Sequence, residues 1–286
     1  MTQRHSPMPT LLITGCSSGI GYHAATTLAQ QGYFVIAVCR RYQDVQHLES
    51  LGLRSVLMDL SSTVSIHNGF AKIRAISQGR IDVLFNNAAF AIPGAVEDLS
   101  RDALGFQFDT NVFGTQELTN LVIPLMRQNG GGKIVYNSSV LGFAAMAYRG
   151  AYNASKFAIE GLADTLRLEL KPAHIHVSLI EPGPIRSQFR ANAYEQYARW
   201  IKDRPSAHRA NYAALEARLE KEGDAAPFTL GPEAVTQALI KIIQSPNPKA
   251  RYRVTWPTKA FAFLKRVLPT RWLDALLMLA GGQGQR

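Results

Sequence analysis

The feature that most constrains the fold of this 286-residue chain is a regular alternation of short apolar runs with longer amphipathic stretches. The runs that we interpret as buried strands are residues 11–14, 34–39, 56–59, 83–85, 134–136 and 176–180. Each is apolar on both faces, which is typical of parallel strands covered by helices on both sides. The stretches between them are long enough for crossover helices. This pattern predicts an α/β fold with a doubly wound parallel sheet.

The alternation stops at Pro184. Residues 184–230 are rich in Arg, Glu and aromatic side chains, and we expect helices but no strand there. Long insertions of this kind in α/β enzymes are typically substrate lids. A further helix is expected from Gly231 to about Gln244, then a strand at 251–255 and two short helices over 258–280, separated at Pro269. We predict one catalytic domain over 1–258, with the lid inside it, and a C-terminal extension over 259–286.

Composition excludes several classes of protein. Hydrophobic residues make up 47% and charged residues 18% of the chain, as in globular proteins and unlike disordered ones. The two cysteines, Cys16 and Cys39, are too few for a disulfide framework and lack the neighbours of a zinc site, so no metal is expected. Residues 1–9 lack the apolar core of a signal peptide, and no apolar run approaches the roughly 20 residues of a membrane span. We expect a cytoplasmic protein.

The net charge of +10 is concentrated near the C-terminus, where residues 241–286 contain nine Lys or Arg and one Asp. No recognition helix or aromatic stacking groups accompany this excess, which argues against a nucleic-acid partner. Apolar residues recur there at helical spacing: Phe261, Leu264, Leu268, Trp272, Leu273, Leu276 and Leu277, with Lys259, Lys265, Arg266 and Arg271 among them. This pattern predicts either peripheral docking on the anionic inner surface of a membrane or packing against the sheet domain or a sister subunit.

A glycine-rich turn, Thr14-Gly15-Cys16-Ser17-Ser18-Gly19-Ile20-Gly21, joins the first expected strand to the first expected helix. Glycine permits positive φ and lets a pyrophosphate approach the helix N-terminus, whose N–H groups and dipole favour anions. The spacing G-x-x-x-G-x-G differs from the general dinucleotide fingerprint G-x-G-x-x-G. We favour a dinucleotide site here, and a plain tight turn is the alternative.

A second signal is the pair Tyr152 and Lys156 at the start of a long expected helix. A spacing of four places both side chains on one helix face. A tyrosine with a pKa of about 10 is a poor acid-base group at neutral pH, and a neighbouring ammonium lowers that pKa toward the working range. The pair therefore indicates a general acid or base, although Y-x-x-x-K by itself occurs by chance in many helices.

Two further polar residues give this pair its context. Ser139 lies 13 residues before Tyr152, just after the expected strand at 133–137, and ligands of open α/β sheets bind at such strand ends. Asn111 lies inside an otherwise helical stretch, where its polarity is unexplained. The alternative for Asn111 is a buried amide that is satisfied by backbone groups.

Taken together, T-G-x-x-x-G-x-G, Asn86-Asn87-Ala88-Ala89, Asn111, Ser139, Tyr152, Lys156 and Pro182-Gly183 resemble the short-chain dehydrogenase/reductase family over about residues 10–185. Two positions depart from the family pattern. Ala89 stands where the family usually has Gly after Asn-Asn-Ala, and Ser187 stands where Thr commonly follows the Pro-Gly turn. Neither change removes a group that the expected chemistry needs.

The resemblance implies a Rossmann-type fold and a role for each matching residue. Tyr152 would be the acid in reduction and the base in oxidation, and Lys156 would tune its pKa and bind the nicotinamide ribose. Ser139, with Tyr152, would bind the substrate oxygen, and Asn111 would hold a water that links Lys156 to solvent. The expected cofactor-binding residues are Gly15, Ser17, Ser18, Gly19, Ile20, Gly21, Arg40, Asp59, Leu60, Asn87, Ala88, Tyr152, Lys156, Pro182, Gly183 and Ile185.

A finer resemblance covers nearly the whole chain. Residues 178–185, 228–234 and 264–269 are similar to bacterial NADP-dependent aldehyde reductases close to the 17β-hydroxysteroid and retinol dehydrogenase branch. It implies an aldehyde substrate and a homodimer or homotetramer. The alternatives are a steroid- or retinoid-type dehydrogenase, a nucleotide-binding sensor without catalysis, and a membrane-surface adaptor. The retention of Asn111, Ser139, Tyr152 and Lys156 together argues against a sensor.

Cofactor preference is expected to depend on the end of the second strand, Val38-Cys39-Arg40-Arg41. No Asp or Glu stands there to bind the ribose hydroxyls of NAD. A guanidinium can bind the adenosine 2′-phosphate of NADP bidentately. We therefore expect NADP(H) to be preferred over NAD(H), with Arg40 as the residue that recognises the phosphate.

Overall fold

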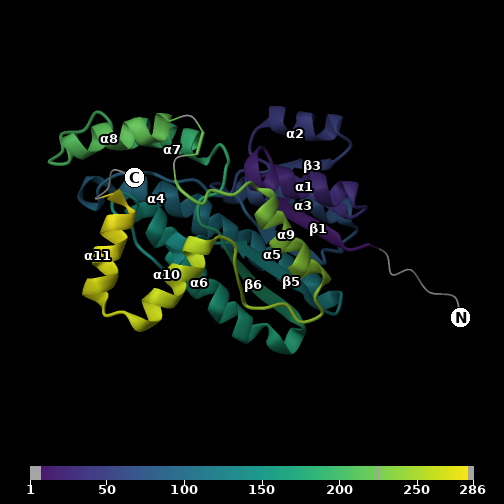
Figure 1. Cartoon of the computed structure of the whole chain (residues 1–286). Coiled ribbons are helices and arrows are strands. Elements are labelled where there is room, and N and C mark those ends of the chain that lie inside the picture. The colour runs from purple at the N-terminus through teal and green to yellow at the C-terminus, as the bar shows by residue number, and fades with distance from the viewer. Residues whose placement is uncertain (1–7, 222, 225, 283–286) are drawn as a thin grey trace, which may run out of the picture.

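The computed structural model describes residues 8–282 except 222 and 225, and it contains a seven-stranded parallel sheet in the order β3-β2-β1-β4-β5-β6-β7 (Figure 1). The strands are β1 (Thr10–Thr14), β2 (Phe34–Cys39), β3 (Arg54–Leu57), β4 (Val83–Asn86), β5 (Gly132–Asn137), β6 (Ile175–Glu181) and β7 (Arg251–Arg253). The order reverses between β1 and β4, so the carboxyl ends of these two strands border the crevice in which such sheets bind ligands. The predicted Rossmann-type fold is confirmed.

Two hydrophobic layers cover the sheet. The helices are α1 (Gly19–Gln30), α2 (Tyr42–Ser50), α3 (Thr63–Ser77), α4 (Arg101–Phe108), α5 (Thr115–Gln128), α6 (Gly150–Glu169), α7 (Phe189–Trp200), α8 (Arg209–Glu220), α9 (Glu233–Gln244), α10 (Trp256–Val267) and α11 (Thr270–Ala280). On one face α3, α5 and α6 bury residues such as Ile66, Leu118 and Ile159. On the other face α1, α2 and α9 bury residues such as Leu28 and Leu239. The expected crossover helices are therefore present on both faces.

Two strands end two residues earlier than predicted. The third strand spans Arg54–Leu57 rather than 56–59, because it lies at the sheet edge, where Arg54 and Leu57 are exposed and the apolar signal is weak. It ends before Asp59, whose carboxylate accepts hydrogen bonds from the Ser61 backbone N–H and hydroxyl. The last strand ends at Arg253 rather than 255, because Thr255 caps α10 by accepting a hydrogen bond from the Thr258 N–H.

A third hydrophobic cluster lies outside the two sheet layers and joins α7, α8, α10 and α11 to the loops after β4 and β5. We keep the name lid for residues 184–230. The expected absence of strands there is confirmed for the described residues, in which Ile185 and Leu230 form only an isolated bridge. The expected break at Pro269 is also confirmed, since α10 ends at Val267 and α11 begins at Thr270. Among the described residues, no helix is long and apolar enough to cross a membrane.

The apolar residues expected at helical spacing on the C-terminal helices do not all face the same way. Phe261, Leu264, Leu268, Leu273 and Leu277 pack into the third cluster. Trp272 and Leu276 instead face outward, with 68% and 38% of their surface exposed. Packing against the rest of the chain is therefore the correct interpretation for most of the predicted stripe, because the lid offers it an apolar surface.

Candidate active site

A single continuous cavity of about 520 Å³ runs from the glycine-rich turn to the lid. Residues expected to bind cofactor or substrate line it: Gly15, Ser17, Ser18, Gly19, Ile20, Arg40, Asp59, Leu60, Asn87, Ala88, Ser139, Tyr152, Lys156, Pro182, Gly183 and Ile185. Gly21 and Asn111 lie behind the lining. The structure thus brings together residues from six separate loops that the sequence could only place at strand ends.

The cofactor end of the cavity is formed by closely approaching backbone. Gly15 has φ +72°, and a Cβ there would lie 2.8 Å from the Ala88 Cα. A Cβ on Gly21 would lie 2.2 Å from the Gly15 carbonyl oxygen. The Ser18 side chain does not cap α1, so the first N–H groups of that helix face the cavity as a ready anion site. This cradle fits the pyrophosphate of a dinucleotide, because any side chain would fill it.

Hydrogen bonds fix the strand ends that border this cradle. The Asn87 amide donates to the Thr14 carbonyl at 2.9 Å, and the Thr14 hydroxyl accepts from the backbone N–H groups of Asn87 and Ala88 at 3.0 Å each. The Asn137 amide in turn donates to the Asn87 side-chain oxygen at 2.9 Å. These bonds join β1, β4 and β5 at their carboxyl ends.

Two neighbouring arginines at the end of β2 differ in their partners. Arg41 pairs with Asp44 at 2.9 Å. Arg40 is exposed and lines the cavity, and within the described part of the chain no acidic side chain pairs with it. Arg40 therefore keeps its guanidinium available for an anionic ligand.

Tyr152 and Ser139 lie together at the middle of the cavity. The Tyr152 side chain is 9% exposed, and its ring meets the edge of the Phe189 ring with centroids 5.3 Å apart. Burial raises the pKa of the Tyr152 phenol well above its usual value near 10, and hydrogen bonding with Ser139 partly opposes this rise. The net direction is opposite to the lowering expected from Lys156, because desolvation is the larger effect. The phenol is consequently protonated at neutral pH.

Lys156 is buried one helical turn beyond Tyr152. Its ammonium donates a 2.7 Å hydrogen bond to the Asn137 carbonyl and lies 5.6 Å from the centre of the Tyr152 ring. Burial lowers the Lys156 pKa to about 8, and the Glu160 carboxylate acts in the opposite direction. Lys156 thus keeps most of its positive charge at neutral pH despite its burial.

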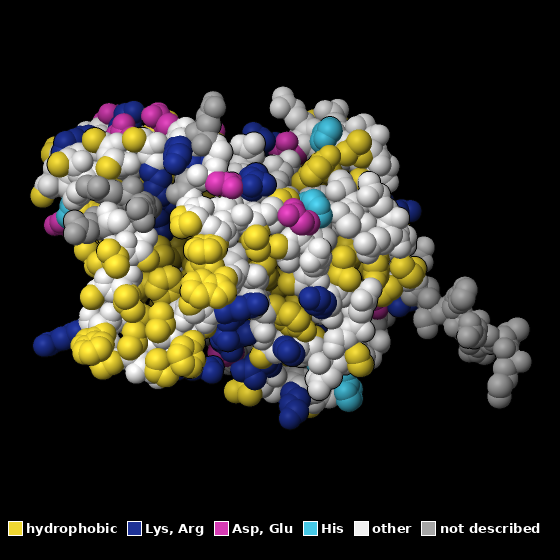
Figure 2. All heavy atoms as spheres, viewed as in Figure 1, with side chains coloured by type: hydrophobic (Ala, Val, Ile, Leu, Met, Phe, Trp, Pro, Cys, Tyr) yellow, Lys and Arg dark blue, Asp and Glu magenta, His cyan; other side chains and the backbone are white. Residues whose placement is uncertain are grey.

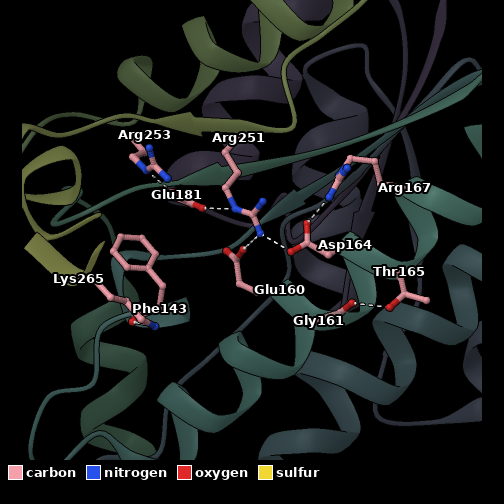
Figure 3. Close-up of polar contacts among 10 residues, drawn as sticks. All are labelled: Phe143, Glu160, Gly161, Asp164, Thr165, Arg167, Glu181, Arg251, Arg253 and Lys265. Atoms are coloured by element: carbon pink, nitrogen blue, oxygen red, sulfur yellow. Dashed lines mark hydrogen bonds and ion pairs between the residues drawn. The ribbon is translucent and has the colours of Figure 1, made fainter. Parts of the chain in front are cut away.

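Glu160 belongs to a group of charged residues that connects α6 to the sheet edge (Figure 3). Arg251 on β7 contacts Glu160 at 3.0 Å and Asp164 at 2.7 Å, both on α6. Its Nε also contacts Glu181 on β6 at 2.9 Å, and Arg253 contacts Glu181 at 3.0 Å. These ion pairs hold the helix that carries Tyr152 and Lys156 against β6 and β7.

Asn111 lies in a π-helical turn, η2 (Asp109–Gly114), between α4 and α5. Its amide accepts from the Phe90 N–H at 3.1 Å and donates to the Phe90 carbonyl at 3.0 Å and to the Ser155 hydroxyl at 3.1 Å. The wider turn satisfies the buried side chain and ties the loop after β4 to α6. These contacts match the alternative of an amide satisfied by backbone, and the water-holding role stays a prediction.

A scan of family models agrees with this geometry, since the model for short chain dehydrogenases matches residues 9–198. This chain belongs to the short-chain dehydrogenase/reductase family of oxidoreductases. Enzymes of this family use NAD or NADP, so the predicted dinucleotide cofactor and enzymatic class are confirmed at that level. The family match rests on the same segment that carries the motifs.

Similar proteins extend the likeness across most of the chain. The oxidoreductase YbbO of Escherichia coli (strain K12) is 42% identical over 93% of this chain and 93% of its own length. Human retinol dehydrogenase 8 is 33% identical over 90% of this chain and 85% of its own length. The crystal structure of a short-chain dehydrogenase from Streptomyces avermitilis superposes with a TM-score of 0.75 at 25% identity, covering 99% of this chain and 98% of that one.

The far end of the cavity in this short-chain dehydrogenase is lined mainly by apolar residues that sequence reasoning did not single out: Phe90, Ile92, Phe106, Val140, Leu141, Met146, Phe189, Leu215 and Leu219. They come from the loops after β4 and β5, from α4, which carries Phe106, and from residues 184–230. For Phe90, Val140 and Leu141 the position just beyond a strand end was the available signal, but apolar residues in a pocket are indistinguishable from core residues in the sequence alone.

Proposed function

We propose that this enzyme interconverts a carbonyl compound, expected to be an aldehyde, and its alcohol by hydride transfer with NADP(H), with Tyr152 as the general acid or base. The observation that carries the proposal is the protonated Tyr152 phenol beside Ser139, with the charged Lys156 on the same helix face. A neutral phenol is a competent proton donor to a developing alkoxide. The site is therefore well suited to reduction.

Each side chain has a separate task in this proposal. The nicotinamide dinucleotide supplies the hydride when bound, and Gly15, Gly19 and Gly21 would hold its pyrophosphate. Ser139 and Tyr152 bind the carbonyl oxygen, and Tyr152 donates the proton to it. Lys156 provides positive charge near the phenolate that remains, and the Asn137 carbonyl orients its ammonium. Asn111 keeps the loop that contains Phe90 in place.

We also propose a preference for NADP(H) over NAD(H). The support is the contrast between Arg41, which Asp44 engages, and Arg40, which lines the cavity without such a partner in the described residues. A 2′-phosphate would supply the missing anion.

The substrate class follows from the lining of the far end. Aromatic and aliphatic side chains form much of it, beside polar ones such as Arg149, Gln188 and Arg218, so an aldehyde with an apolar body is the expected substrate. The likeness to retinol dehydrogenase 8 supports an apolar alcohol or carbonyl, and a retinoid- or steroid-type activity is the second candidate. A sensor without catalysis would not need Ser139 and Tyr152 together.

The remaining proposals concern the domain boundaries, the oligomeric state and the cellular location of the enzyme. We propose a catalytic domain over residues 1–258, a lid at about 184–230 and an extension over 259–286. We propose that the enzyme acts in the cytoplasm, as a homodimer or homotetramer, with peripheral contact at the inner membrane surface. The basic composition of residues 241–286 supports that contact.

The decisive experiment follows NADPH absorbance with a panel of aldehydes, ketones and alcohols. Tyr152→Phe should lower kcat by about 10²–10⁴, because the proton donor is lost, and should leave NADPH binding nearly unchanged. Tyr42→Phe, at an exposed tyrosine outside the cavity, is the control and should keep full activity. Turnover of Tyr152→Phe within a few-fold of the parent enzyme would exclude Tyr152 as the donor.

A further inference from the structure

The C-terminal helices α10 and α11 carry a second apolar face, directed away from the protein. Its residues are Trp256, Phe263, Val267, Trp272, Leu276, Met278 and Leu279, which are between 38% and 74% exposed. Figure 2 shows hydrophobic side chains gathered over these helices, with basic side chains beside them. We call these seven residues the outer face. A soluble helix pair normally places polar side chains in such positions.

The outer face is distinct from the stripe that the sequence indicated. Leu264, Leu273 and Leu277 pack inward into the third hydrophobic cluster. These inward residues already join the two helices to the core of the protein. Helices that are apolar on both sides are typically covered on both sides. Within the described residues, no segment of the chain covers the outer face, which leaves it available to a partner.

The charges around the outer face identify that occupant. Lys259, Arg266 and Arg271 are exposed and form no ion pair among the described residues, whereas Asp274 is the single acidic residue of 241–286. Lys265 is also exposed, and its ammonium donates to the Phe143 carbonyl (Figure 3). In a two-fold dimer through this face the same basic patch would meet itself, which is unfavourable. An anionic surface is complementary to it.

The outer face also reaches the rim of the substrate cavity. The Phe228 ring, 62% exposed, lies against Trp256 with centroids 5.8 Å apart. The neighbours of Phe228, Pro227 and Thr229, line the cavity, and so does Ala280 at the end of α11. The exposed apolar surface and the cavity wall are thus continuous through the lid and through α11.

We propose that the outer face of α10 and α11 docks on an anionic lipid bilayer and that apolar substrates enter the cavity from that bilayer. With 12 and 11 residues, the two helices are too short to span a membrane and would lie in its interface. Trp256 and Trp272 suit that depth, because indole rings favour the boundary between lipid and water. The proposed docking depends on the outer face and not on the enzyme's activity. The proposed route of substrate entry rests on the proposed function.

The test measures sedimentation of the full-length enzyme with vesicles of phosphatidylcholine, with and without phosphatidylglycerol. Docking predicts binding to the anionic vesicles at low salt and its loss at high salt. Phe263→Gln combined with Trp272→Gln should abolish it. The matched control, Val64→Gln combined with Leu168→Gln, changes two equally exposed apolar residues on α3 and α6 and should bind like the parent. Melting temperatures establish that all variants are folded.

A second pair of variants tests the charges. Arg266→Gln combined with Arg271→Gln should weaken partitioning onto anionic vesicles by about thirtyfold, at roughly fivefold per basic side chain. Lys72→Gln combined with Arg74→Gln on α3, also exposed, should leave partitioning unchanged. Equal binding to neutral and anionic vesicles, or equal loss in both pairs of variants, would overturn the proposed electrostatic docking.

Two readouts separate docking from the catalytic proposal. The sedimentation assay needs no substrate, so it tests docking whether or not the enzyme reduces aldehydes. With a water-soluble aldehyde, Phe263→Gln/Trp272→Gln should match the parent kcat/KM, while with a long-chain aldehyde held in anionic vesicles it should fall at least tenfold. If the same variant instead turns a dimer into a monomer in sedimentation velocity and the parent never binds vesicles, the outer face is a subunit interface and the proposal is wrong.

Discussion

The cofactor end and the substrate end of the cavity are built by different means. At the cofactor end the glycines let backbone approach backbone, and Gly15 and Gly21 leave no room for a methyl group. At the substrate end the wall includes large side chains such as Phe189 and Leu215. Tyr197 and Tyr212 belong to the same hydrophobic cluster, and their rings pack on one another with centroids 5.7 Å apart. Backbone walls tolerate almost no substitution, whereas side-chain walls can be reshaped one residue at a time. The contrast explains how one cofactor site can serve many substrates.

The backbone wall can be tested with Gly21→Ala. Because the new Cβ would lie 2.2 Å from the Gly15 carbonyl oxygen, the turn must shift, at a cost of about 3 kcal/mol of unfolding free energy and with weaker NADPH binding. Gly161→Ala on α6 is the matched control, since nothing lies within 4 Å of its Cβ position and alanine favours helix by about 1 kcal/mol. Urea unfolding measures the stability of both variants, and NADPH titration measures their cofactor affinity. Equal stability of the two variants would contradict the contrast.

Arg40→Ala tests the one place where the cofactor end depends on a side chain. Loss of a charged hydrogen-bond donor worth about 1.5–3 kcal/mol should lower the ratio of kcat/KM for NADPH over NADH by roughly tenfold to a hundredfold. Arg41→Ala should change that ratio little, because Asp44 already engages Arg41. A shift in Arg41→Ala without one in Arg40→Ala would reassign phosphate recognition to Arg41.

Tyr212→Phe tests the packing that supports the side-chain wall. The Tyr212 hydroxyl accepts from the Ala95 N–H at 3.0 Å and donates to Asp98, so it connects the lid to the loop after β4. Its removal leaves a buried N–H unpaired and should lower the free energy of unfolding by about 1–2 kcal/mol, with a higher KM for the carbonyl substrate and an unchanged NADPH affinity. Tyr194→Phe, whose hydroxyl accepts a hydrogen bond from Lys202, should lower stability by less than about 0.5 kcal/mol. Weaker NADPH binding in Tyr212→Phe would contradict the separation of the two ends.

Glu160→Gln should give the smallest effect, on pH dependence. The Glu160 carboxylate stabilises the Lys156 ammonium, whose pKa is about 8, so its neutralisation should lower that pKa. The alkaline limb of kcat/KM for NADPH would then move to lower pH by up to about one unit. Asp164→Asn, which loses a contact to the same Arg251 one turn farther from Lys156, should leave the profile in place. A shift to higher pH would refute the electrostatic role of Glu160.

The sequence predicted most of the fold because burial on both faces makes the inner strands continuously apolar, and periodicity reports burial directly. It failed at β3, where an edge strand exposes Arg54 and Leu57 and the apolar pattern fades. It predicted the glycine-rich turn, because a phosphate cradle needs glycine at fixed spacing. It missed the apolar wall of Phe90, Met146 and Leu215, because apolar residues in a pocket and in a core have the same composition.

By itself the sequence determined the parallel sheet and the glycine cradle, since each depends on local spacing, and it proposed Tyr152, Lys156, Ser139 and Asn111 as a set through the family resemblance. Only the tertiary structure decided which of two neighbouring arginines is paired, that burial rather than Lys156 governs the Tyr152 pKa, and which apolar residues of α10 and α11 face outward. These outcomes depend on what lies across from a side chain in space. Desolvation and pairing act over a few ångströms between segments far apart in the chain, and helical spacing alone does not tell an inner face from an outer one.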